Sequence, residues 1–375
     1  MSRALEICRD LVSFNSVTYN KSDILEYVKS ILAAMDFDVQ ILEFTDEKTG
    51  RCVENLFASR GETIDSLGIL GHLDTVPAGE GWSFDPFKAT EYNGKLYGRG
   101  IVDMKGGVGC VLAALEELDK ASQDRISIFF TCDEEVGSYE GVQTMLDWAK
   151  ERNEIPTDCL ICEPSSNEKI GDRIYIGHRG TINIEVRANG VQSHSAYVTK
   201  ESSGNALEKI CNFVSKISNY DFKDESEFFK ATIASPTILN SSNLAVNVIP
   251  PLASANFNVR FSDKFTSESI FEIFKDLAAE DGLTANFTKS GEPYICKNDR
   301  LLECAKNSIY EELGYYPEFS TGGGTSDGRF MINYCPVVEF GMVDRTLHQV
   351  NEHIEICDCE KLKNVYKRFI LKYFE

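Results

Sequence analysis

Short segments made mostly of apolar residues alternate with helical patterns in the first half of the chain, and this alternation constrains the fold more than any other feature. Apolar runs at 67–70, 126–132 and 159–162 fit buried strands, and a helical pattern at 107–120 lies between the first two. Strands with few polar positions are typical of a parallel sheet that helices cover on both faces. We therefore predict an α/β domain with a mostly parallel sheet.

The pattern changes after about residue 180. Residues 182–187 alternate between apolar and polar side chains, as a strand of a half-exposed antiparallel sheet does. The next expected elements are a helix, two strands, a helix and a strand, at 203–217, 230–238, 253–261, 267–280 and 283–289. This β-α-β-β-α-β order is the ferredoxin-like plan. We predict that residues 181–290 form an inserted α+β domain, and that residues 1–180 and 291–375 together form the catalytic domain.

Charge and composition argue against several classes of function. The net charge of −21 does not suit binding to nucleic acid or to an anionic membrane, because both need clustered Lys and Arg. The first residues lack the apolar core of a signal peptide, and no apolar run approaches the roughly 18 residues of a membrane span. The 12 Cys have no disulfide-framework spacing, so we expect reduced thiols and a cytoplasmic location.

Acidic and histidine residues come directly after the expected strands. The clusters are His72-Leu-Asp74, Asp133-Glu134-Glu135 and Glu163-Pro164, and glycines surround a further acidic residue in Gly98-Arg-Gly-Ile-Val-Asp103-Met-Lys-Gly. The carboxyl ends of parallel strands meet at one edge of a sheet, where ligands bind. Carboxylates gathered there repel one another unless cations neutralise them. Because mixed imidazole and carboxylate ligands suit zinc or a similar cation, the sequence predicts a metal site at this edge.

Each cluster also has an ordinary structural explanation. His72 and Asp74 fit a surface or capping pair, adjacent Glu134 and Glu135 fit a solvated helix start, and Glu163-Pro164 fits a turn. The metal site is favoured because all the clusters occur together, and always at the ends of strands.

These clusters, with three further motifs, resemble the di-zinc aminoacylase/carboxypeptidase superfamily. The further motifs are Ser193-His194-Ser195, Gly323-Gly-Thr-Ser-Asp-Gly-Arg-Phe330 and Thr346-Leu-His348-Gln-Val-Asn-Glu352. The resemblance extends over nearly the whole chain, including the division of the catalytic domain by an insert. The resemblance implies a metal-dependent hydrolase of N-acyl amides, with a zinc-peptidase-like catalytic domain and an inserted lid that also forms a homodimer.

Position by position, the resemblance implies two Zn²⁺ per subunit, with Co²⁺ or Mn²⁺ as substitutes. Asp103 would bridge the two ions, His72 and Glu163 would complete one site, and Glu135 and His348 would complete the other. These five residues are the expected metal ligands.

The resemblance assigns further roles around the ions. Glu134 would act as the general base, and Asp74 would orient a metal-ligating histidine. His194 would stabilise the reacting oxygen from the partner subunit. The residues expected to bind the substrate are Arg179, Asn247, Arg260, Gly324 and Thr325.

The last two motifs most resemble enzymes that hydrolyse N-succinyl-LL-diaminopimelate to succinate and LL-diaminopimelate. Two positions depart from that pattern, because His178 stands where Arg is usual and Asp344 stands where Asn is expected. The segment around His178 is closer to deacetylases of N-acetylornithine. That activity and small-peptide carboxypeptidase activity are the enzymatic alternatives. A catalytically inactive, metabolite-binding relative is the alternative from another class.

Overall fold

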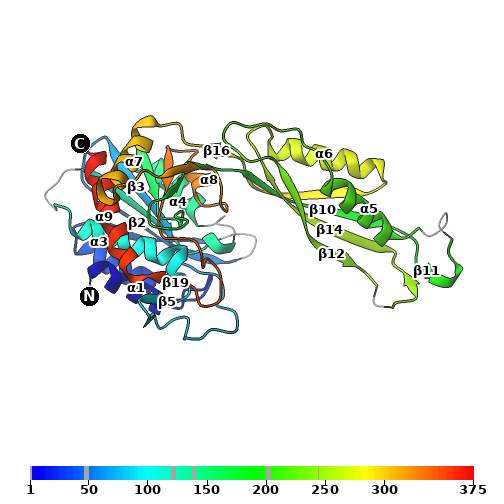
Figure 1. Ribbon diagram of the computed structural model, residues 1–375, viewed down its shortest axis with the longest axis horizontal. Coiled ribbons are helices and arrows are strands. Elements are labelled where there is room, and N and C mark those ends of the chain that lie inside the picture. The colour runs from blue at the N-terminus through cyan, green and yellow to red at the C-terminus, as the bar shows by residue number, and fades with distance from the viewer. Residues whose placement is uncertain (1, 46–49, 120–123, 137–140, 200–203, 244) are drawn as a thin grey trace. The chain divides into compact units, whose positions relative to one another are not determined.

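The computed structural model describes residues 2–45, 50–119, 124–136, 141–199, 204–243 and 245–375. They form two compact units, each with its own sheet (Figure 1). The first unit contains the residues up to 177 and those from 295 onward, and the second contains residues 178–294. None of the described helices is long and apolar enough to cross a membrane.

The first unit is built on an eight-stranded sheet with the order β1-β2-β6-β3-β7-β18-β8-β17. Its strands are β1 (Asp38–Thr45), β2 (Cys52–Arg60), β3 (Ser66–His72), β6 (Arg125–Thr131), β7 (Asp158–Ile161), β8 (Arg173–Tyr175), β17 (Glu318–Ser320) and β18 (Val337–Glu339). β3 runs parallel to β6 and β7, and β7 runs parallel to β18. The predicted α/β class with a mostly parallel sheet is confirmed.

The centre of this unit is apolar because helices cover the sheet. Every residue of β3 is buried. In α3 (Gly106–Glu116), every residue except the last, Glu116, is buried. α3 packs against α1 (Arg3–Ser13) and α9 (Ile356–Tyr373). Gly109 allows α1 and α3 to approach closely, because a Cβ at this position would lie 2.6 Å from the Sγ of Cys8. Burial of this apolar surface stabilises the unit by roughly 25 cal/mol per Å².

Two strands of the first unit are not apparent from the sequence pattern. β1 and β2 form an antiparallel hairpin that extends the sheet beside β6. β1 forms an edge of the sheet, and its residues are all half-buried or exposed, so it lacks the apolar run of a central strand.

The other helices of the unit are α2 (Ile24–Ala33), α4 (Val142–Glu151), α7 (Asp299–Leu313) and α8 (Gly328–Met331). A separate three-stranded sheet contains β4 (Thr90–Tyr92), β5 (Lys95–Tyr97) and β19 (His353–Glu355).

The second unit is a four-stranded antiparallel sheet with two helices. Its strands are β10 (Gly180–Asn189), β12 (Ile233–Ser241), β14 (Leu252–Phe261) and β15 (Thr284–Gly291), in the order β12-β14-β10-β15. The helices α5 (Ala206–Ser218) and α6 (Ser267–Glu280) lie along this sheet (Figure 1), and their buried side chains share one core with it. The chain therefore follows the predicted β-α-β-β-α-β order.

Alternation of side chains explains why one face of this second sheet is covered. Ile182, Ile184 and Val186 of β10 are fully buried and pack with Phe257 and Phe274 in the core. The residues between them are more exposed. Two further pairs of short strands are present. β11 (Ser193–His194) pairs with β13 (Val248–Ile249) within the second unit, and β9 (Gly177–His178) pairs with β16 (Tyr294–Ile295) where the chain enters and leaves it.

Candidate metal centre

The predicted metal ligands lie at the carboxyl ends of the central strands. His72 is the last residue of β3, and Glu163 follows the end of β7 by two residues. Glu135 lies in the single helical turn Glu134–Val136 after β6. Asp103 lies in the kinked turn Ile101–Lys105, just before α3. The parallel arrangement of β3, β6 and β7 therefore brings residues from distant parts of the chain to one edge of the sheet.

One group of possible ligand atoms comes from His72, Asp103 and Glu163. The Nε2 atom of His72 lies 2.9 Å from Oδ1 of Asp103 and 3.9 Å from Oε1 of Glu163. The imidazole of His72 is almost completely buried, and the two carboxylates are largely buried. This mixed set of nitrogen and oxygen donors fits a divalent cation.

A second group comes from Asp103, Glu135 and His348. The Nε2 atom of His348 lies 3.0 Å from Oδ2 of Asp103 and 3.2 Å from Oε1 of Glu135. Asp103 therefore directs one carboxylate oxygen to each histidine. The structure brings all five predicted ligands together, and two groups that share one carboxylate fit a pair of cations.

His348 reaches this position with an uncommon backbone conformation. Its φ angle is 59°, in the left-handed region that residues other than glycine rarely adopt. Such conformations persist where the surrounding structure holds them, and they often occur at functional sites.

The charges of the site stabilise positive charge on its histidines. Hydrogen bonds to Asp103 and Glu135 raise the pKa of His348 to about 10. Burial alone would lower the pKa of His72, but its contacts with Asp103 and Asp74 raise that pKa well above the usual range. The carboxylates around the two imidazoles therefore favour their protonated forms. The same position that stabilises these protons would stabilise divalent ions.

Asp74 connects the first histidine to the segment after β6. The carbonyl oxygen of Asp74 lies 3.1 Å from Nδ1 of His72, and its Oδ1 lies 3.4 Å from the same nitrogen. The carboxylate of Asp74 accepts hydrogen bonds from the backbone N–H groups of Glu134 and Glu135, at 3.3 Å each, and from the hydroxyl of Thr18 at 2.7 Å. Both the backbone and the side chain of Asp74 thus lie near Nδ1 of His72, and the orienting role of Asp74 stays a prediction.

Glu134, the predicted general base, lies beside the candidate ligands. Burial raises the pKa of Glu134 well above its usual range, and the nearby carboxylate of Asp327 raises it further. Burial also raises the pKa of Glu163. A carboxyl group with a raised pKa holds a proton more readily near neutral pH, which suits a group that accepts and then returns a proton.

The residues predicted to bind the substrate fall on both units. Gly324 and Thr325 lie in the loop after β17, in the first unit. In the second unit, Nδ2 of Asn247 lies 3.4 Å from Nε2 of His194, so these two predicted residues are in contact. Their side chains are exposed.

The two predicted arginines contact oxygen atoms of the second unit. Arg179 donates a hydrogen bond from Nη1 to the carbonyl oxygen of Ala231, at 3.3 Å. Arg260 donates from Nε to Oδ1 of Asn258, at 3.0 Å. Their predicted role in binding the substrate stays a prediction.

Both departures from the expected pattern are packed against other side chains. The carboxylate of Asp344 lies 2.5 Å from Nη2 of Arg173, so an arginine 171 residues away balances its charge. His178 is buried, and its ring meets the ring of Tyr294 edge-on at 5.7 Å. Neither contact is apparent from the sequence.

Sequence reasoning gave no role to Arg99 or to Glu352, although both surround Asp103. Their side chains form a buried ion pair at 2.7 Å, and the carboxylate of Glu352 also contacts the backbone of the turn that carries Asp103. The signal in the sequence was that both residues stand inside quoted motifs, Arg99 four positions before Asp103 and Glu352 four positions after His348.

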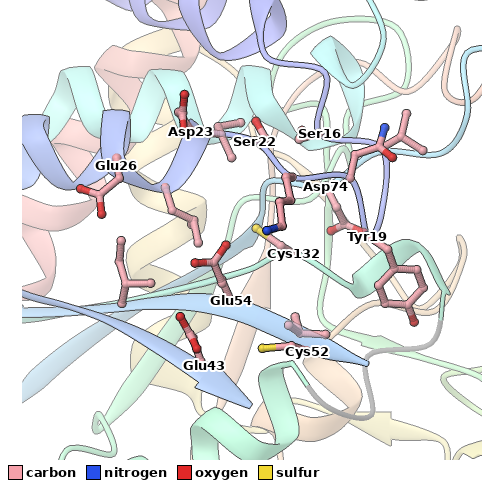
Figure 2. Close-up of a pocket in the computed structure, with 17 residues that line it drawn as sticks. Ser16, Tyr19, Ser22, Asp23, Glu26, Glu43, Cys52, Glu54, Asp74 and Cys132 are labelled. Carbon is pink, nitrogen blue, oxygen red and sulfur yellow. The ribbon is translucent and has the colours of Figure 1, made fainter. Parts of the chain in front are cut away.

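Asp74 also lines a pocket of about 510 Å³ (Figure 2). Asp74 and Cys132 line it together with Glu26, Glu43 and Glu54, and none of the five candidate ligands does so. The pocket is therefore separate from the candidate metal centre.

A group of thiols provides a third set of possible metal ligands. The Sγ atoms of Cys8, Cys110 and Cys359 lie within 4.8 Å of one another in the core, where α1, α3 and α9 meet. Cys8 donates a hydrogen bond to the carbonyl oxygen of Gly106, and Cys110 donates one to that of Cys359. These hydrogen bonds satisfy the thiols of Cys8 and Cys110, and we interpret the group as part of the core.

Comparison with known proteins agrees with this architecture and chemistry. Residues 68–372 match the family described as peptidase family M20/M25/M40. A succinyl-diaminopimelate desuccinylase from Ehrlichia canis is 34% identical, and the alignment covers 99% of this chain and 98% of that protein. The enzyme of the same name from Bradyrhizobium diazoefficiens is 37% identical, with 100% of both chains covered.

Solved structures show the same fold. An M20 metallo-carboxypeptidase from Sulfolobus solfataricus has a TM-score of 0.78 at 16% identity, with 100% of this chain and 99% of that chain covered. A dinuclear metal-binding M20 peptidase from Bacillus subtilis has a TM-score of 0.70 at 15% identity, with 98% and 97% covered.

Proposed function

Because this chain belongs to peptidase family M20/M25/M40 and is a metal-dependent amidohydrolase, we propose that its substrate is N-succinyl-LL-diaminopimelate. Water adds across the amide bond, so that the acyl carbon gains oxygen and the nitrogen leaves as an amine. The products are succinate and LL-diaminopimelate. The observation that carries this substrate is the similarity, along the whole chain, to relatives named succinyl-diaminopimelate desuccinylase.

We further propose that the centre holds two Zn²⁺, for which Co²⁺ or Mn²⁺ can substitute. His72 and Glu163 would hold one ion, Glu135 and His348 the other, and Asp103 would contact both. The contact of each Asp103 oxygen with a different histidine supports this assignment. When bound, the ions supply positive charge and lower the pKa of a bound water.

In this proposal, Glu134 moves the proton of the reaction. Its carboxylate accepts a proton from the attacking water and later gives it to the nitrogen of the leaving amine. The raised pKa of Glu134 supports this role, because the group must hold the proton between the two steps. Asp74 keeps His72 oriented through the contacts at Nδ1.

The second unit is proposed to complete the site from a second copy of the chain. His194 would donate to the developing negative charge on the amide oxygen, and its contact with Asn247 supports a shared role. β12 supports a homodimer, because it lies at an edge of its sheet and exposes Ile238 and Leu239. An exposed apolar edge strand pairs readily with another chain.

Arg179, Arg260 and Asn247 are proposed to bind the carboxylates of the substrate, with backbone N–H groups at Gly324 and Thr325. The ion pair of Asp344 with Arg173 favours the succinyl substrate, because a balanced Asp344 does not repel a second carboxylate. Deacetylation of N-acetylornithine is the second candidate, and the histidine at position 178 favours it.

The decisive experiment compares hydrolysis of N-succinyl-LL-diaminopimelate and N-acetylornithine by the zinc-loaded protein, with Glu134→Ala as the control. A preference for the succinyl substrate that disappears in the control is expected. Preference for the acetyl substrate would overturn the proposed substrate but keep the reaction. Hydrolysis of neither would contradict both.

A further inference from the structure

The carboxylate of Glu352 holds the backbone of the turn that carries Asp103. Its Oε2 accepts a hydrogen bond from the N–H of Gly100 at 3.0 Å, and its Oε1 accepts from those of Val102 at 2.8 Å and Asp103 at 3.4 Å. The side chain of Glu352 is completely buried. A buried carboxylate is costly unless hydrogen bonds satisfy it, and here both oxygens are used.

Arg99 balances the charge of this carboxylate. Its Nη1 lies 2.7 Å from Oε2 of Glu352, and Arg99 is itself buried. Its Nη2 donates to the carbonyl oxygen of Ala78 at 2.9 Å, and its guanidinium lies 5.2 Å from the ring centre of Trp82. Arg99 is thus fixed on several sides, and Glu352 has a rigid partner.

The backbone at Glu352 connects the same turn to a second candidate ligand. The carbonyl oxygen of Glu352 accepts a hydrogen bond from the N–H of Gly98 at 3.0 Å, and the following residue, His353, pairs with Tyr97. His348 lies only four residues before Glu352. One short segment therefore carries a candidate ligand of one ion and the carboxylate that holds the residue shared by both ions.

We propose that Glu352 is a positioning residue, which holds the turn of Asp103 so that its two oxygens face different histidines before any metal binds. This inference rests on the proposed function, since it takes Asp103 as the shared ligand. The carboxylate of Glu352 accepts its hydrogen bonds from backbone N–H groups of the turn, so it acts through the position of Asp103.

A purely structural role for the Arg99–Glu352 pair predicts a different result. Loss of the pair would then lower the stability of the fold and leave zinc affinity unchanged. Asp158 provides a matched control, because it is also buried and accepts hydrogen bonds from Tyr373 at 2.9 Å and Asn298 at 2.6 Å. It begins β7, at the opposite end from Glu163.

The test measures Zn²⁺ affinity by competition with a chromophoric chelator, and thermal unfolding of the metal-free proteins, for Glu352→Gln, Glu352→Asp and Asp158→Asn. The Gln side chain lacks the charge and one acceptor oxygen. The Asp side chain is one methylene shorter, so its carboxylate lies farther from the turn. We expect both Glu352 variants to bind zinc about 10- to 100-fold more weakly, whereas Asp158→Asn keeps the affinity of the unmodified chain. Equal zinc affinity in all four proteins would overturn the inference.

Hydrogen exchange of the unmodified protein decides the question even if the Glu352 variants do not fold. The amides of Gly100, Val102 and Asp103 should be protected in the metal-free protein to the level of α3. Protection that appears only after zinc is added would mean that the metal orders the turn, and would overturn the inference. Failure of the unmodified chain to bind zinc would overturn the proposed function, and this inference with it. Zinc binding with unaffected variants would overturn this inference alone.

Discussion

At the scale of single residues, Glu134 is the side chain with the most direct consequence for the rate. Replacement by Gln keeps its size and removes the proton acceptor. We expect kcat to fall about 10²- to 10⁴-fold, which is the usual contribution of a general base. Zinc content, measured by elemental analysis, should not change, because Glu134 belongs to neither of the two groups of candidate metal ligands.

Glu54→Gln is the matched control for this prediction. Glu54 is an exposed carboxylate that lines the same pocket as Asp74. Its replacement should leave kcat unchanged. A Glu134→Gln enzyme as fast as the Glu54→Gln enzyme would contradict the assignment of the base.

His348 predicts a pH dependence of metal uptake. In the metal-free protein its pKa is raised from about 6.5 to about 10, so its proton stabilises the fold below about 6.5 and this contribution is lost as the pH rises through about 10. A ligating imidazole must be neutral, so zinc displaces this proton within that window. Near pH 8 we expect zinc binding to release more protons from the unmodified protein than from His348→Gln, as calorimetry in two buffers can measure. Equal release from both proteins would be evidence against His348 as a ligand.

Arg173 and Asp344 predict a coupled effect on substrate preference. Arg173→Met leaves the carboxylate of Asp344 without its partner, and a like charge beside a substrate carboxylate costs several kcal/mol. We expect kcat/KM for the succinyl substrate to fall at least about tenfold. Arg173→Met combined with Asp344→Asn should recover most of this loss. Independent effects of the two changes in a double-mutant cycle would show that the pair does not tune the substrate.

At the scale of elements, the ends of strands were predictable and the contacts between distant loops were not. His72, Glu135 and Glu163 follow apolar runs that are recognisable as strands, so the edge where they meet follows from the parallel sheet. By contrast, the hydrogen bond that Glu352 accepts from the N–H of Val102 joins residues 250 positions apart, and no local sequence pattern predicts it.

The elements that the sequence analysis missed have a physical explanation as well. The hairpin of β1 and β2 lies at an edge of the sheet, where β1 is half exposed and has no clean apolar pattern. The inserted β-α-β-β-α-β unit was recognisable because its strands alternate between a buried and a more exposed face. The pattern of apolar and polar residues therefore identifies strands with one buried and one exposed face. It fails for a strand such as β1, whose residues are all partly exposed.

The close packing of α1 on α3 predicts a cost for the smallest substitution. In Gly109→Ala the new Cβ would lie 2.6 Å from Sγ of Cys8 and 3.1 Å from its backbone nitrogen. Overpacking of a core costs about 1–3 kcal/mol, whereas Gly to Ala in a helix gains only up to about 1 kcal/mol. We expect a net loss of up to about 2 kcal/mol in urea unfolding.

Two variants check the cause of this loss. Cys8→Ala in the Gly109→Ala background removes the Sγ atom and should recover part of the stability. Gly324→Ala has no atom within 4 Å of the new Cβ and should leave stability unchanged. A Gly109→Ala protein as stable as the unmodified chain would contradict the tight packing of α1 on α3.

At the scale of the whole molecule, the proposed homodimer can be tested by mixing inactive variants. If His194 acts in the partner's site, a heterodimer of Glu134→Ala and His194→Ala contains one site with both residues intact. Mixing the two proteins after subunit exchange should therefore restore activity, measured on the succinyl substrate. The dimer itself is checked by sedimentation equilibrium.

Either of two results would contradict this arrangement. A monomer in sedimentation would exclude a contribution of His194 from a second copy. A dimer whose mixed variants stay inactive would place His194 in its own subunit's site, or outside any site. The exposed apolar residues of β12 make the first result unexpected.

The division of the first unit into two stretches of chain sets the order in which a ribosome can complete it. Residues 178–294 must be synthesised before the second stretch, which carries His348, emerges. At about 5–20 residues per second the synthesis of this segment lasts about 6 to 23 seconds. The inserted unit, whose core is continuous in the chain, can fold during that time, while four of the five candidate ligands wait for the fifth. A nascent chain would thus be unable to hold both metal ions, and remain without activity, until the segment with His348 has emerged.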